Sequence, residues 1–314
     1  MIMRLSIVVP CYNEEPVLQE TTVRLSAVLD SLVEKRKISS DSFILYINDG
    51  SRDMTWTIIE SLHDRNSYVK GLNLAGNVGH QNALMAGLMT AKGYADVLIS
   101  IDADLQDDVS VIEEMVDRYK EGYDIVYGVR SSRDSDTFFK KNTALAFYKL
   151  MSWLGVKSVY NHADYRLMSR RAVEQLGNYK ERNLFLRGIV PLIGYETTSV
   201  YYRRSERFAG ESKYPLSKMF NFAIDGITSF SVKPLRLIAS LGFLFLLCSL
   251  VVVVYTLYVY FNGETVAGWA SLMLSVWFLG SLILIAIGIV GEYIGKIYLE
   301  VKERPRYNIE KFLN

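Results

Sequence analysis

The sequence predicts an α/β domain, with a mostly parallel sheet covered by helices on both faces, followed by a hairpin of two membrane-spanning helices. Three observations support this fold class. Short β-rich runs alternate with segments of helical apolar spacing over the first 130 residues. Clusters of polar residues directly follow four of the β-rich runs. Two long stretches near the C-terminus contain no charged residue.

The alternating segments have defined places in the chain. We expect strands over residues 6–10, 43–47, 69–74, 97–101 and 124–127. Apolar residues recur with helical spacing over residues 15–35, 56–62, 81–91 and 111–119. Alternating strands and helices form a mostly parallel sheet, which binds ligands beyond the carboxyl ends of its strands. The polar clusters fall at those ends, over residues 11–14, 48–51, 75–79 and 102–107.

The last of these clusters is the most informative. A β-rich run ends directly in Asp102, Asp104 and Gln106. Alternate residues of an extended backbone share a face, so these three side chains should point the same way. Hard oxygen ligands suit Mg²⁺ or Mn²⁺, and such an ion would bridge to phosphate oxygens of a substrate. A solvated acidic turn is the alternative.

The two uncharged stretches run from Leu237 to Phe261 and from Thr265 to Gly291. At ~1.5 Å per residue, either helix would exceed the ~30 Å hydrocarbon core of a bilayer. Their length argues against the alternative, a pair of buried core helices. Only Asn262, Gly263 and Glu264 separate the stretches, so both outer ends of the hairpin should lie on one side of the membrane.

Charge predicts the orientation of this hairpin. Glu264 is the one charged residue between the two stretches, whereas basic residues flank the outer ends. These are Lys233, Arg236, Lys296, Lys302, Arg304, Arg306 and Lys311. The positive-inside rule therefore predicts a multi-pass protein of the cell (inner) membrane with its α/β domain and C-terminus in the cytoplasm. We divide the chain into that domain (1–234), the hairpin (235–298) and a cytoplasmic tail (299–314).

The region before the hairpin is less regular. We expect amphipathic helices near residues 139–154 and 215–232, which either pack on the core or lie in the membrane interface. A net charge of +1 gives no general attraction to nucleic acid. Cys11 falls in the domain and Cys248 in a predicted span, so we expect neither a disulfide nor redox or zinc chemistry.

Several motifs together resemble a known family. Residues 8–15, 48–51 and 102–107 resemble, in order and spacing, the signatures of family 2 glycosyltransferases with the GT-A fold. Residues 164–168, 207–214, 291–298 and 303–307 are similar to the polyisoprenyl-phosphate hexosyltransferases, the dolichol-phosphate-mannose-synthase-like branch, and among them to bacterial bactoprenol glucosyltransferases. The resemblance covers essentially the whole chain.

The resemblance implies a hexosyltransferase that acts with inversion. Its donor would be a nucleotide sugar, UDP-glucose on this likeness, and its acceptor undecaprenyl phosphate. The same reaction with GlcNAc, mannose, galactose or an aminoarabinose derivative stays open, because no residue dictates the hydroxyl pattern of the sugar. A processive polysaccharide synthase is disfavoured, since two spans cannot enclose a polymer path.

The resemblance also assigns the donor site. Base and ribose would be bound by Pro10, Tyr12, Glu14 and Asp49, and the rest of the nucleotide sugar by Asn77, Gly79 and Asp102. Asp102, Asp104 and Gln106 would hold Mg²⁺ or Mn²⁺, which stabilises charge on the leaving diphosphate. The family often has Asp where this chain has Asn48, which keeps an acceptor but loses a charge.

Basic residues are the candidate phosphate ligands, since arginine presents a planar fork to phosphate oxygens. Those of the loop after the sheet are Arg130, Arg133, Lys140 and Lys141. A second group, placed to meet a lipid acceptor before the membrane, consists of the basic residues Arg207 and Lys213 and the hydroxyl residues Ser212 and Tyr214. Which of them serve the donor and which the acceptor stays open, and a solvated surface charge is the alternative for each cation.

Asp164 is the candidate base of the family, with Asp104 the other catalytic carboxylate. The second pKa of a phosphate monoester is about 6, so the acceptor is already largely ionised at pH 7. Asp164 therefore either removes a proton or orients the acceptor. His63, His80 and His162 lack metal-ligand spacing, and we assign them to structural or surface positions, although His80 begins a helix where a donor contact stays open.

Two other classes of protein are alternatives to an enzyme of this kind. A non-catalytic membrane scaffold has no reason to keep an uncompensated acidic cluster, and a nucleotidyltransferase has no need of a membrane hairpin. Small residues in the spans permit close helix packing and thus a homo-oligomer, whose existence stays open. They are Gly242, Gly280, Ser281, Gly288 and Gly291.

Overall fold

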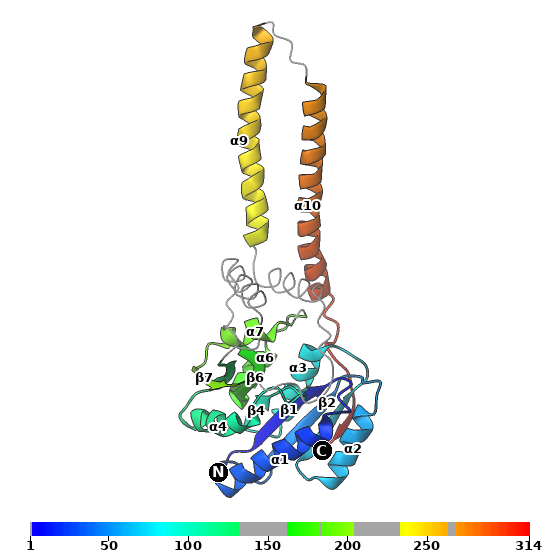
Figure 1. The fold of residues 1–314 in the computed structure, drawn as a ribbon, viewed down its shortest axis with the longest axis vertical. Helices are drawn as coiled ribbons and strands as arrows, with labels where there is room; N and C mark the ends of the chain where they lie inside the picture. The colour runs from blue at the N-terminus through cyan, green and yellow to red at the C-terminus, as the bar shows by residue number, and fades with distance from the viewer. Residues whose placement is uncertain (1, 132–161, 183, 204–232, 263–267) are drawn as a thin grey trace. The chain divides into compact units, whose positions relative to one another are not determined.

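The computed structural model describes residues 2–131, 162–182, 184–203, 233–262 and 268–314 (Figure 1). The chain forms two compact units, which we describe separately. The sheet unit falls within Met1–Tyr148, Lys157–Pro215 and Arg304–Asn314. The hairpin unit falls within Lys149–Val156 and Leu216–Glu303.

The sheet unit is built on an eight-stranded sheet in the order β7-β5-β6-β4-β1-β2-β3-β8. The strands are β1 (Leu5–Cys11), β2 (Phe43–Asn48), β3 (Val69–Leu74), β4 (Val97–Ser100), β5 (Ile125–Arg130), β6 (His162–Ser169), β7 (Thr197–Tyr202) and β8 (Ile309–Leu313). Strand β6 runs antiparallel to β4 and β5, and β8 runs antiparallel to β3. The other neighbouring pairs are parallel, which confirms the predicted mostly parallel sheet.

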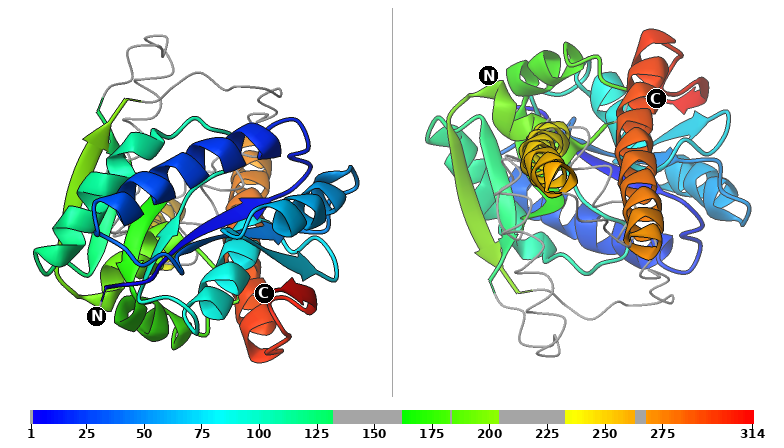
Figure 2. Two further views of the ribbon diagram at one scale, coloured as in Figure 1. Left: turned by 90° about the horizontal axis from the view of Figure 1, so that it is seen from below. Right: turned by 90° about the horizontal axis from the view of Figure 1, so that it is seen from above.

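Helices cover both faces of this sheet (Figure 2). Long helices of the unit are α1 (Leu18–Glu34), α2 (Thr55–Arg65), α3 (His80–Ala91), α4 (Ile112–Lys120) and α6 (Arg170–Gly177). Short ones are η1 (Val109–Val111), α7 (Leu186–Ile189) and η2 (Val190–Ile193). Alternation along the strands separates the two faces. Tyr46 bonds to Thr22 of α1, whereas its neighbour Ile47 packs against Gly87 of α3.

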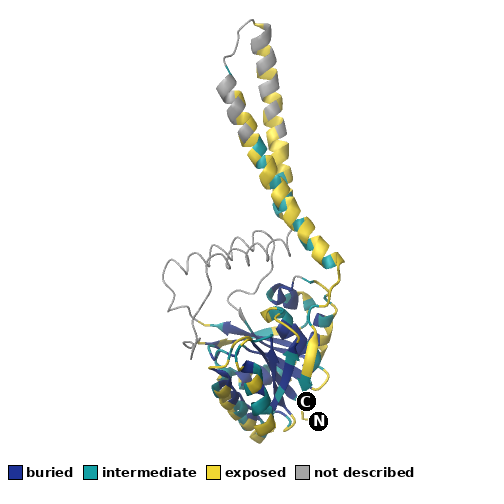
Figure 3. Cartoon of the chain, turned by 90° about the vertical axis from the view of Figure 1, so that its right-hand side faces the viewer, coloured by how far each residue is buried: buried dark blue, intermediate teal, exposed yellow. Residues whose placement is uncertain are grey.

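The central strands are buried along their whole length (Figure 3). Every residue of β1 and β2 is buried, which is why the sequence of β1 is apolar apart from Ser6 rather than alternating. Burial on both faces leaves most polar residues of these segments to the positions after the strands. The carboxyl edge of the sheet is therefore where chemistry collects.

The first five predicted strands and four predicted helices are present, with ends within a few residues of those expected. Strands β6, β7 and β8 were not predicted. Their short sequences carry no strong period, and their places in the sheet depend on long-range pairing that local spacing does not encode. The expected amphipathic helices near 139–154 and 215–232 lie outside the described residues.

The C-terminal segment differs most from expectation. Residues 299–314 are expected to form a tail, but Ile309–Leu313 is strand β8, which pairs with the edge strand β3. Leu313 packs against Gly71 of β3, and the Ala75 amide donates to the carbonyl of Asn308 over 3.0 Å. The end of the chain is thus part of the sheet unit.

The hairpin unit contains helices α9 (Lys233–Phe261) and α10 (Trp269–Val301). Large apolar side chains on both helices are exposed, including Val251 at 70% and Leu284 at 71%. Among the described residues, the stretch Phe278–Val301 meets the length and apolarity of a membrane span. Long helices that expose large apolar side chains, as the described residues of this unit do, are typical of membrane association, and the unit matches the C-terminal part of the chain that associates with a membrane.

Candidate active site

The loops after β1 and β2 are joined at the carboxyl edge of the sheet. Asn13 has a left-handed backbone with φ of 55°, and its amide donates to Ser51 Oγ over 3.0 Å. The amide of Arg52 donates to Asn13 Oδ1 over 2.8 Å. The amide of Glu14 donates to Thr55 Oγ1 over 2.9 Å. Asparagine tolerates this backbone and bonds to its neighbours, so it suits the position.

Three predicted nucleotide-binding residues surround the end of β1. Pro10 is buried within the strand, Glu14 is half-buried, and Tyr12 keeps 43% of its surface exposed. An exposed aromatic ring offers a stacking face for a base. The structure places these residues together, and their contact with a nucleotide stays a prediction.

Asp49 joins the loop after β2 to the loop after β3. Its buried carboxylate accepts hydrogen bonds from the amides of Val78 (2.7 Å) and Gly79 (3.0 Å) and from Asn77 Nδ2 (3.2 Å). Burial raises the pKa of Asp49, while these backbone amides and His80 oppose the rise. Asp49 therefore determines where Asn77 and Gly79 lie.

Gly50 allows the two loops to approach this closely. Its φ is 62°, in the left-handed region that favours glycine. A Cβ atom at this position would lie 2.5 Å from the backbone nitrogen of Asn77 and 2.7 Å from the carbonyl carbon of Gly76. Any side chain here would push the loops apart.

The acidic segment after β4 does not continue as a strand. Since β4 ends at Ser100 and a turn follows, the prediction that Asp102, Asp104 and Gln106 alternate along an extended backbone is wrong. Leu105 has a left-handed φ of 56°, yet its side chain is buried. The Gln106 amide donates to Asp104 Oδ1 over 3.2 Å. Such a backbone costs about 1–3 kcal/mol and is typical of functional sites.

Asp102 and Asp164 meet where β4 and β6 end their pairing. The antiparallel register pairs Ser100 with Arg166, and two residues further along Asp102 comes opposite Asp164. His80, the first residue of α3, contacts both: its Nε2 lies 3.5 Å from Asp102 Oδ1 and 3.8 Å from Asp164 Oδ2. We call Asp102, Asp104, Asp164 and His80 the acidic corner.

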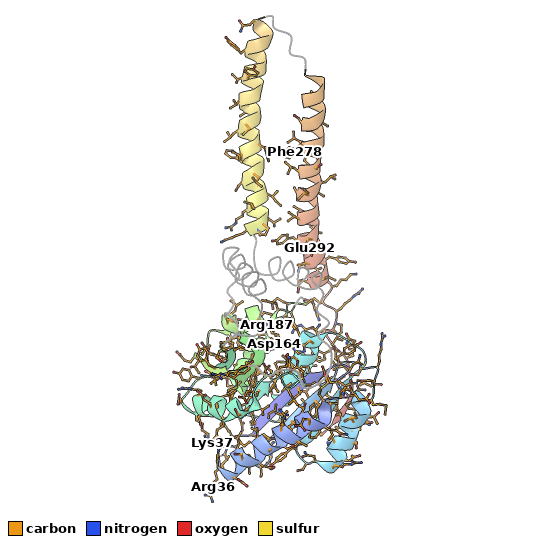
Figure 4. All side chains as sticks on the ribbon, viewed as in Figure 1. Arg36, Lys37, Asp164, Arg187, Phe278 and Glu292 are labelled. Carbon is orange, nitrogen blue, oxygen red and sulfur yellow. The ribbon has the colours of Figure 1, made fainter. Side chains whose placement is uncertain are left out.

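Two arginines, Arg166 and Arg187, hold Asp164. Figure 4 labels Asp164 and Arg187. Arg166 Nη2 lies 2.5 Å from Asp164 Oδ1, and Arg187 Nη2 lies 3.1 Å from Oδ2. Arg166 is buried, whereas 34% of the Arg187 side chain is exposed. Burial by itself would raise the pKa of Asp164, but Arg187, Arg166 and His80 together hold it well below its usual value. Asp164 is therefore ionised at neutral pH.

Helix α3 also fixes the position of Arg187. Gln81, the second residue of α3, accepts a hydrogen bond from the Leu186 amide over 2.8 Å. The carbonyl of Leu186 in turn accepts from Arg166 Nη1 over 3.4 Å. Both the amide and the carbonyl of Leu186 are thus hydrogen-bonded. This places the neighbouring residue, Arg187, beside Asp164.

The residues of the acidic corner fit a divalent cation. Burial raises the pKa of Asp102 to about 6; His80 opposes the rise, and Asp164, Asp107 and Asp104 add to it. A cation relieves such crowding of carboxylates. Within the described part of the chain, no three His, Cys, Asp or Glu side chains form a complete metal cage. Mg²⁺ commonly takes one or two carboxylates from the protein and further ligands from substrate phosphates.

The predicted phosphate ligand Arg130 lies beside a buried carboxylate. Its Nη2 donates to Asp107 Oδ1 over 3.1 Å, and the Tyr202 hydroxyl donates to the same oxygen over 2.5 Å. A role of Arg130 in phosphate binding stays a prediction. The other predicted phosphate or acceptor ligands lie outside the described residues: Arg133, Lys140, Lys141, Arg207, Ser212, Lys213 and Tyr214.

Two family profiles match the chain along most of its length. The profile described as glycosyl transferase family 2 matches residues 6–177, and the one described as the GtrB C-terminal hairpin matches residues 233–297. The chain belongs to glycosyltransferase family 2. The family 2 assignment makes it an enzyme and confirms the resemblance seen in its motifs.

Relatives of this family 2 glycosyltransferase match nearly end to end. The chain is 57% identical over 306 residues to the uncharacterized glycosyltransferase YkoT of Bacillus subtilis, covering 98% of this chain and 91% of that protein. It is 41% identical over 320 residues to the SfII prophage-derived bactoprenol glucosyl transferase of Shigella flexneri, covering 98% of both. A prophage bactoprenol glucosyl transferase homolog of Escherichia coli is 39% identical over 317 residues, covering 98% and 99%.

Solved structures show a more distant likeness to this family 2 enzyme. Glucosyl-3-phosphoglycerate synthase of Mycobacterium tuberculosis, solved with Mn²⁺, UDP and phosphoglyceric acid, is 17% identical with a TM-score of 0.45. The match covers 72% of this chain and 76% of that one.

The sequence patterns singled out Arg187 not at all and His80 only as an open alternative. His80, assigned to structural or surface positions with a donor contact left open, lies against two carboxylates of the acidic corner. Arg187 was not singled out, although it is the one charged residue in the run Leu184–Ile189. A lone arginine in an apolar run is the signal that points to it. Its partner Asp164 becomes visible only in the folded chain.

Proposed function

We propose that this glycosyltransferase transfers glucose from UDP-glucose to undecaprenyl phosphate, with inversion at the anomeric carbon. The observation that carries the proposal is the near full-length likeness to bactoprenol glucosyl transferases of Shigella flexneri and Escherichia coli. The acidic corner supports it, because carboxylates at the carboxyl edge of the sheet suit a metal-bound diphosphate.

Asp164 acts in this proposal as an orienting group rather than as a base. Its pKa lies well below the usual range, so it is a poor proton acceptor at neutral pH. The acceptor phosphate needs no base, because its second pKa is about 6. Ionised Asp164 instead aligns Arg187, whose partly exposed guanidinium is placed to bind a phosphate oxygen.

Asp102, Asp104 and Gln106 would hold Mg²⁺ or Mn²⁺. The bound ion supplies Lewis-acid stabilisation of negative charge on the departing nucleoside diphosphate. His80 lies beside Asp102, and its ring limits where that carboxylate can point. The buried Leu105 side chain fixes the turn that carries Asp104 and Gln106.

We further propose that α9 and α10 cross the cell membrane twice, with the sheet unit in the cytoplasm. The chain enters the hairpin unit from the sheet unit and returns to it in β8, so the number of crossings must be even. Basic residues on both outer flanks favour the cytoplasmic side for the sheet unit.

A donor panel tests the proposed reaction. The purified full chain, in detergent with undecaprenyl phosphate and Mg²⁺ or Mn²⁺, is incubated with UDP-glucose, UDP-GlcNAc, UDP-galactose and GDP-mannose. We expect lipid-linked glucose, detected by mass spectrometry, with the inverted anomeric configuration by NMR. The variant Asp104→Ala and an excess of chelator should each abolish it. Lipid-linked product from another sugar, or equal turnover in chelator, contradicts the corresponding part of the proposal.

A further inference from the structure

We propose that strand β8 positions the donor loop, residues 48–51, through a directional hydrogen-bond relay of three side chains, Glu310, Asn73 and Asn48. The relay also accounts for asparagine at position 48. Glu310 is then a positioning residue that acts on the nucleotide site from the far end of the chain. The inference rests on the proposed function, because it takes this loop as part of the donor site.

The relay crosses three neighbouring strands at one edge of the sheet. Asn73 Nδ2 on β3 donates to Glu310 Oε2 on β8 over 2.7 Å. Asn48 Nδ2 on β2 donates to Asn73 Oδ1 over 2.7 Å. The Ser51 amide donates to Asn48 Oδ1 over 3.2 Å. A continuous chain of donors and acceptors thus runs from β8 into the donor loop.

Chemistry fixes the direction of this chain. A carboxylate only accepts hydrogen bonds, so Glu310 requires Asn73 to turn its NH₂ group outward. Asn73 then presents its oxygen to residue 48, which must donate. The Ser51 amide needs an acceptor from the same residue. Asparagine supplies one of each, whereas aspartate would supply two acceptors.

A β-bulge brings Glu310 to the correct face. Asn73 pairs with Lys311, but Leu74 pairs with Ile309, so Glu310 is the extra residue of β8. Neighbouring residues of a regular strand point to opposite faces, and Lys311 instead pairs with Glu60 of α2. Bulges commonly redirect a side chain in this way.

The relay ends at the most restrained part of the donor loop. Asn48 is only 4% exposed, and it is followed by Asp49 and Gly50, which hold the loop after β3. A wrongly turned Asn48 side chain would leave the Ser51 amide without its acceptor. Ser51 Oγ bonds to Asn13 in the loop after β1, so the disturbance would spread to both donor loops.

A double-mutant cycle tests the relay. The variant Asn48→Asp turns the Asn73 side chain around, so that the Asn73 oxygen faces the Glu310 carboxylate. The KM for the nucleotide sugar and the Kd for UDP should then rise about tenfold, which is the effect of losing one or two hydrogen bonds. Glu310→Gln can present either an oxygen or an NH₂ group, so it should change both constants less than twofold. In the double variant Asn48→Asp/Glu310→Gln the NH₂ group completes the reversed chain, and affinity should return to within about threefold of the parent value.

Three results would overturn the relay. They are a double variant as impaired as Asn48→Asp, an Asn48→Asp variant with unchanged KM and Kd, and a change confined to kcat. If Asn48→Asp does not fold, Glu310→Ala serves as the second probe: it should raise the Kd for UDP about threefold, and an unchanged Kd contradicts the relay. Lys311→Met, on the same strand with its ion pair to Glu60, is the control and should leave Kd unchanged.

UDP affinity is measured by calorimetry without any lipid. A parent chain that binds UDP but transfers no sugar to undecaprenyl phosphate contradicts the proposed reaction and leaves the relay test intact. A parent chain that transfers sugar but shows no coupling between positions 48 and 310 contradicts the relay alone.

Discussion

At the scale of single residues, the site depends on pairs that lie far apart in sequence. Asp102, Asp104 and Asp164 were predicted, because acidic residues after a β-rich run and in a family motif stand out. Arg187 was not predicted and a site contact of His80 was only left open, because each becomes informative only when β6 pairs antiparallel with β4. Residue types can be predicted at this scale, and their partners cannot.

Asp164→Asn should lower kcat about 100-fold, because Arg187 loses the charge that aligns it and small misplacements in a site are costly. We expect this loss at every pH, with the acid limb of the pH–rate profile unmoved. A shifted acid limb with a preserved plateau would show that Asp164 is a base. Asp124→Asn is the control. Asp124 is also buried and paired with an arginine, but it precedes β5 and so lies at the edge of the sheet opposite the carboxyl edge.

The same variant should alter the pH dependence of stability. The folded-state pKa of Asp164 is lowered, so its contribution is present above the unfolded pKa of about 3.9 and is lost as the pH falls through the folded value. Asp164→Asn should therefore lower the free energy of unfolding by about 3 kcal/mol at pH 7. The difference from the parent chain should shrink below pH 4. Urea unfolding at pH 7 and at pH 3 measures both.

His80→Ala should reduce kcat/KM at least tenfold, because the His80 ring lies 3.5 Å from Asp102 and 3.8 Å from Asp164 and its loss frees both carboxylates to move. The matched variant is His63→Ala. His63 of α2 bonds to the carbonyl of Val69 in β3, away from the acidic corner. His63→Ala should change stability alone. Equal kcat/KM for the two variants would remove His80 from the site.

At the scale of elements, strands β1 to β5 were predictable, and β6, β7 and β8 were not. Polar residues follow β1 to β4 shortly after each strand ends, so the hydrophobic runs and the polar residues after them locate these strands. The turn after β4 escaped prediction, since leucine rarely adopts the left-handed backbone that Leu105 has there. Tertiary burial of that side chain overrides local preference.

Two glycine substitutions test how closely the loops after β2 and β3 approach each other. Gly50→Ala places a Cβ 2.5 Å from the Asn77 nitrogen at a φ of 62°, so stability should fall by about 2 kcal/mol or more and UDP affinity should fall with it. Gly76→Ala, for which nothing lies within 4 Å of the added Cβ, should change neither. Thermal unfolding and UDP titration compare the two, and equal effects would contradict the close approach.

At the scale of the whole molecule, the two-part organisation was predicted from charge and hydropathy alone. The missing element was β8, because no local signal shows that five residues after a membrane hairpin complete a sheet begun near the N-terminus. Their pairing with β3 carries a topological consequence. Residues 309–313 and the acidic corner belong to one unit, so we expect them on the same side of the membrane.

Cysteine labelling tests this sidedness. In intact cells a membrane-impermeant maleimide should label Asn262→Cys, which lies between α9 and α10, and should label Asn314→Cys only after lysis. The parent cysteines give little background, because Cys11 is buried and Cys248 lies within the apolar helix α9. Labelling of both positions from the outside would contradict two crossings.

Strand β8 also determines when the sheet is completed. A ribosome makes residues 309–313 after both helices of the hairpin. Until β8 pairs with it, β3 is an edge strand whose outer amide and carbonyl groups can pair with another chain. The sheet is therefore complete only after both helices of the hairpin have been made, and a chain that stops before residue 309 would leave β3 as an edge strand.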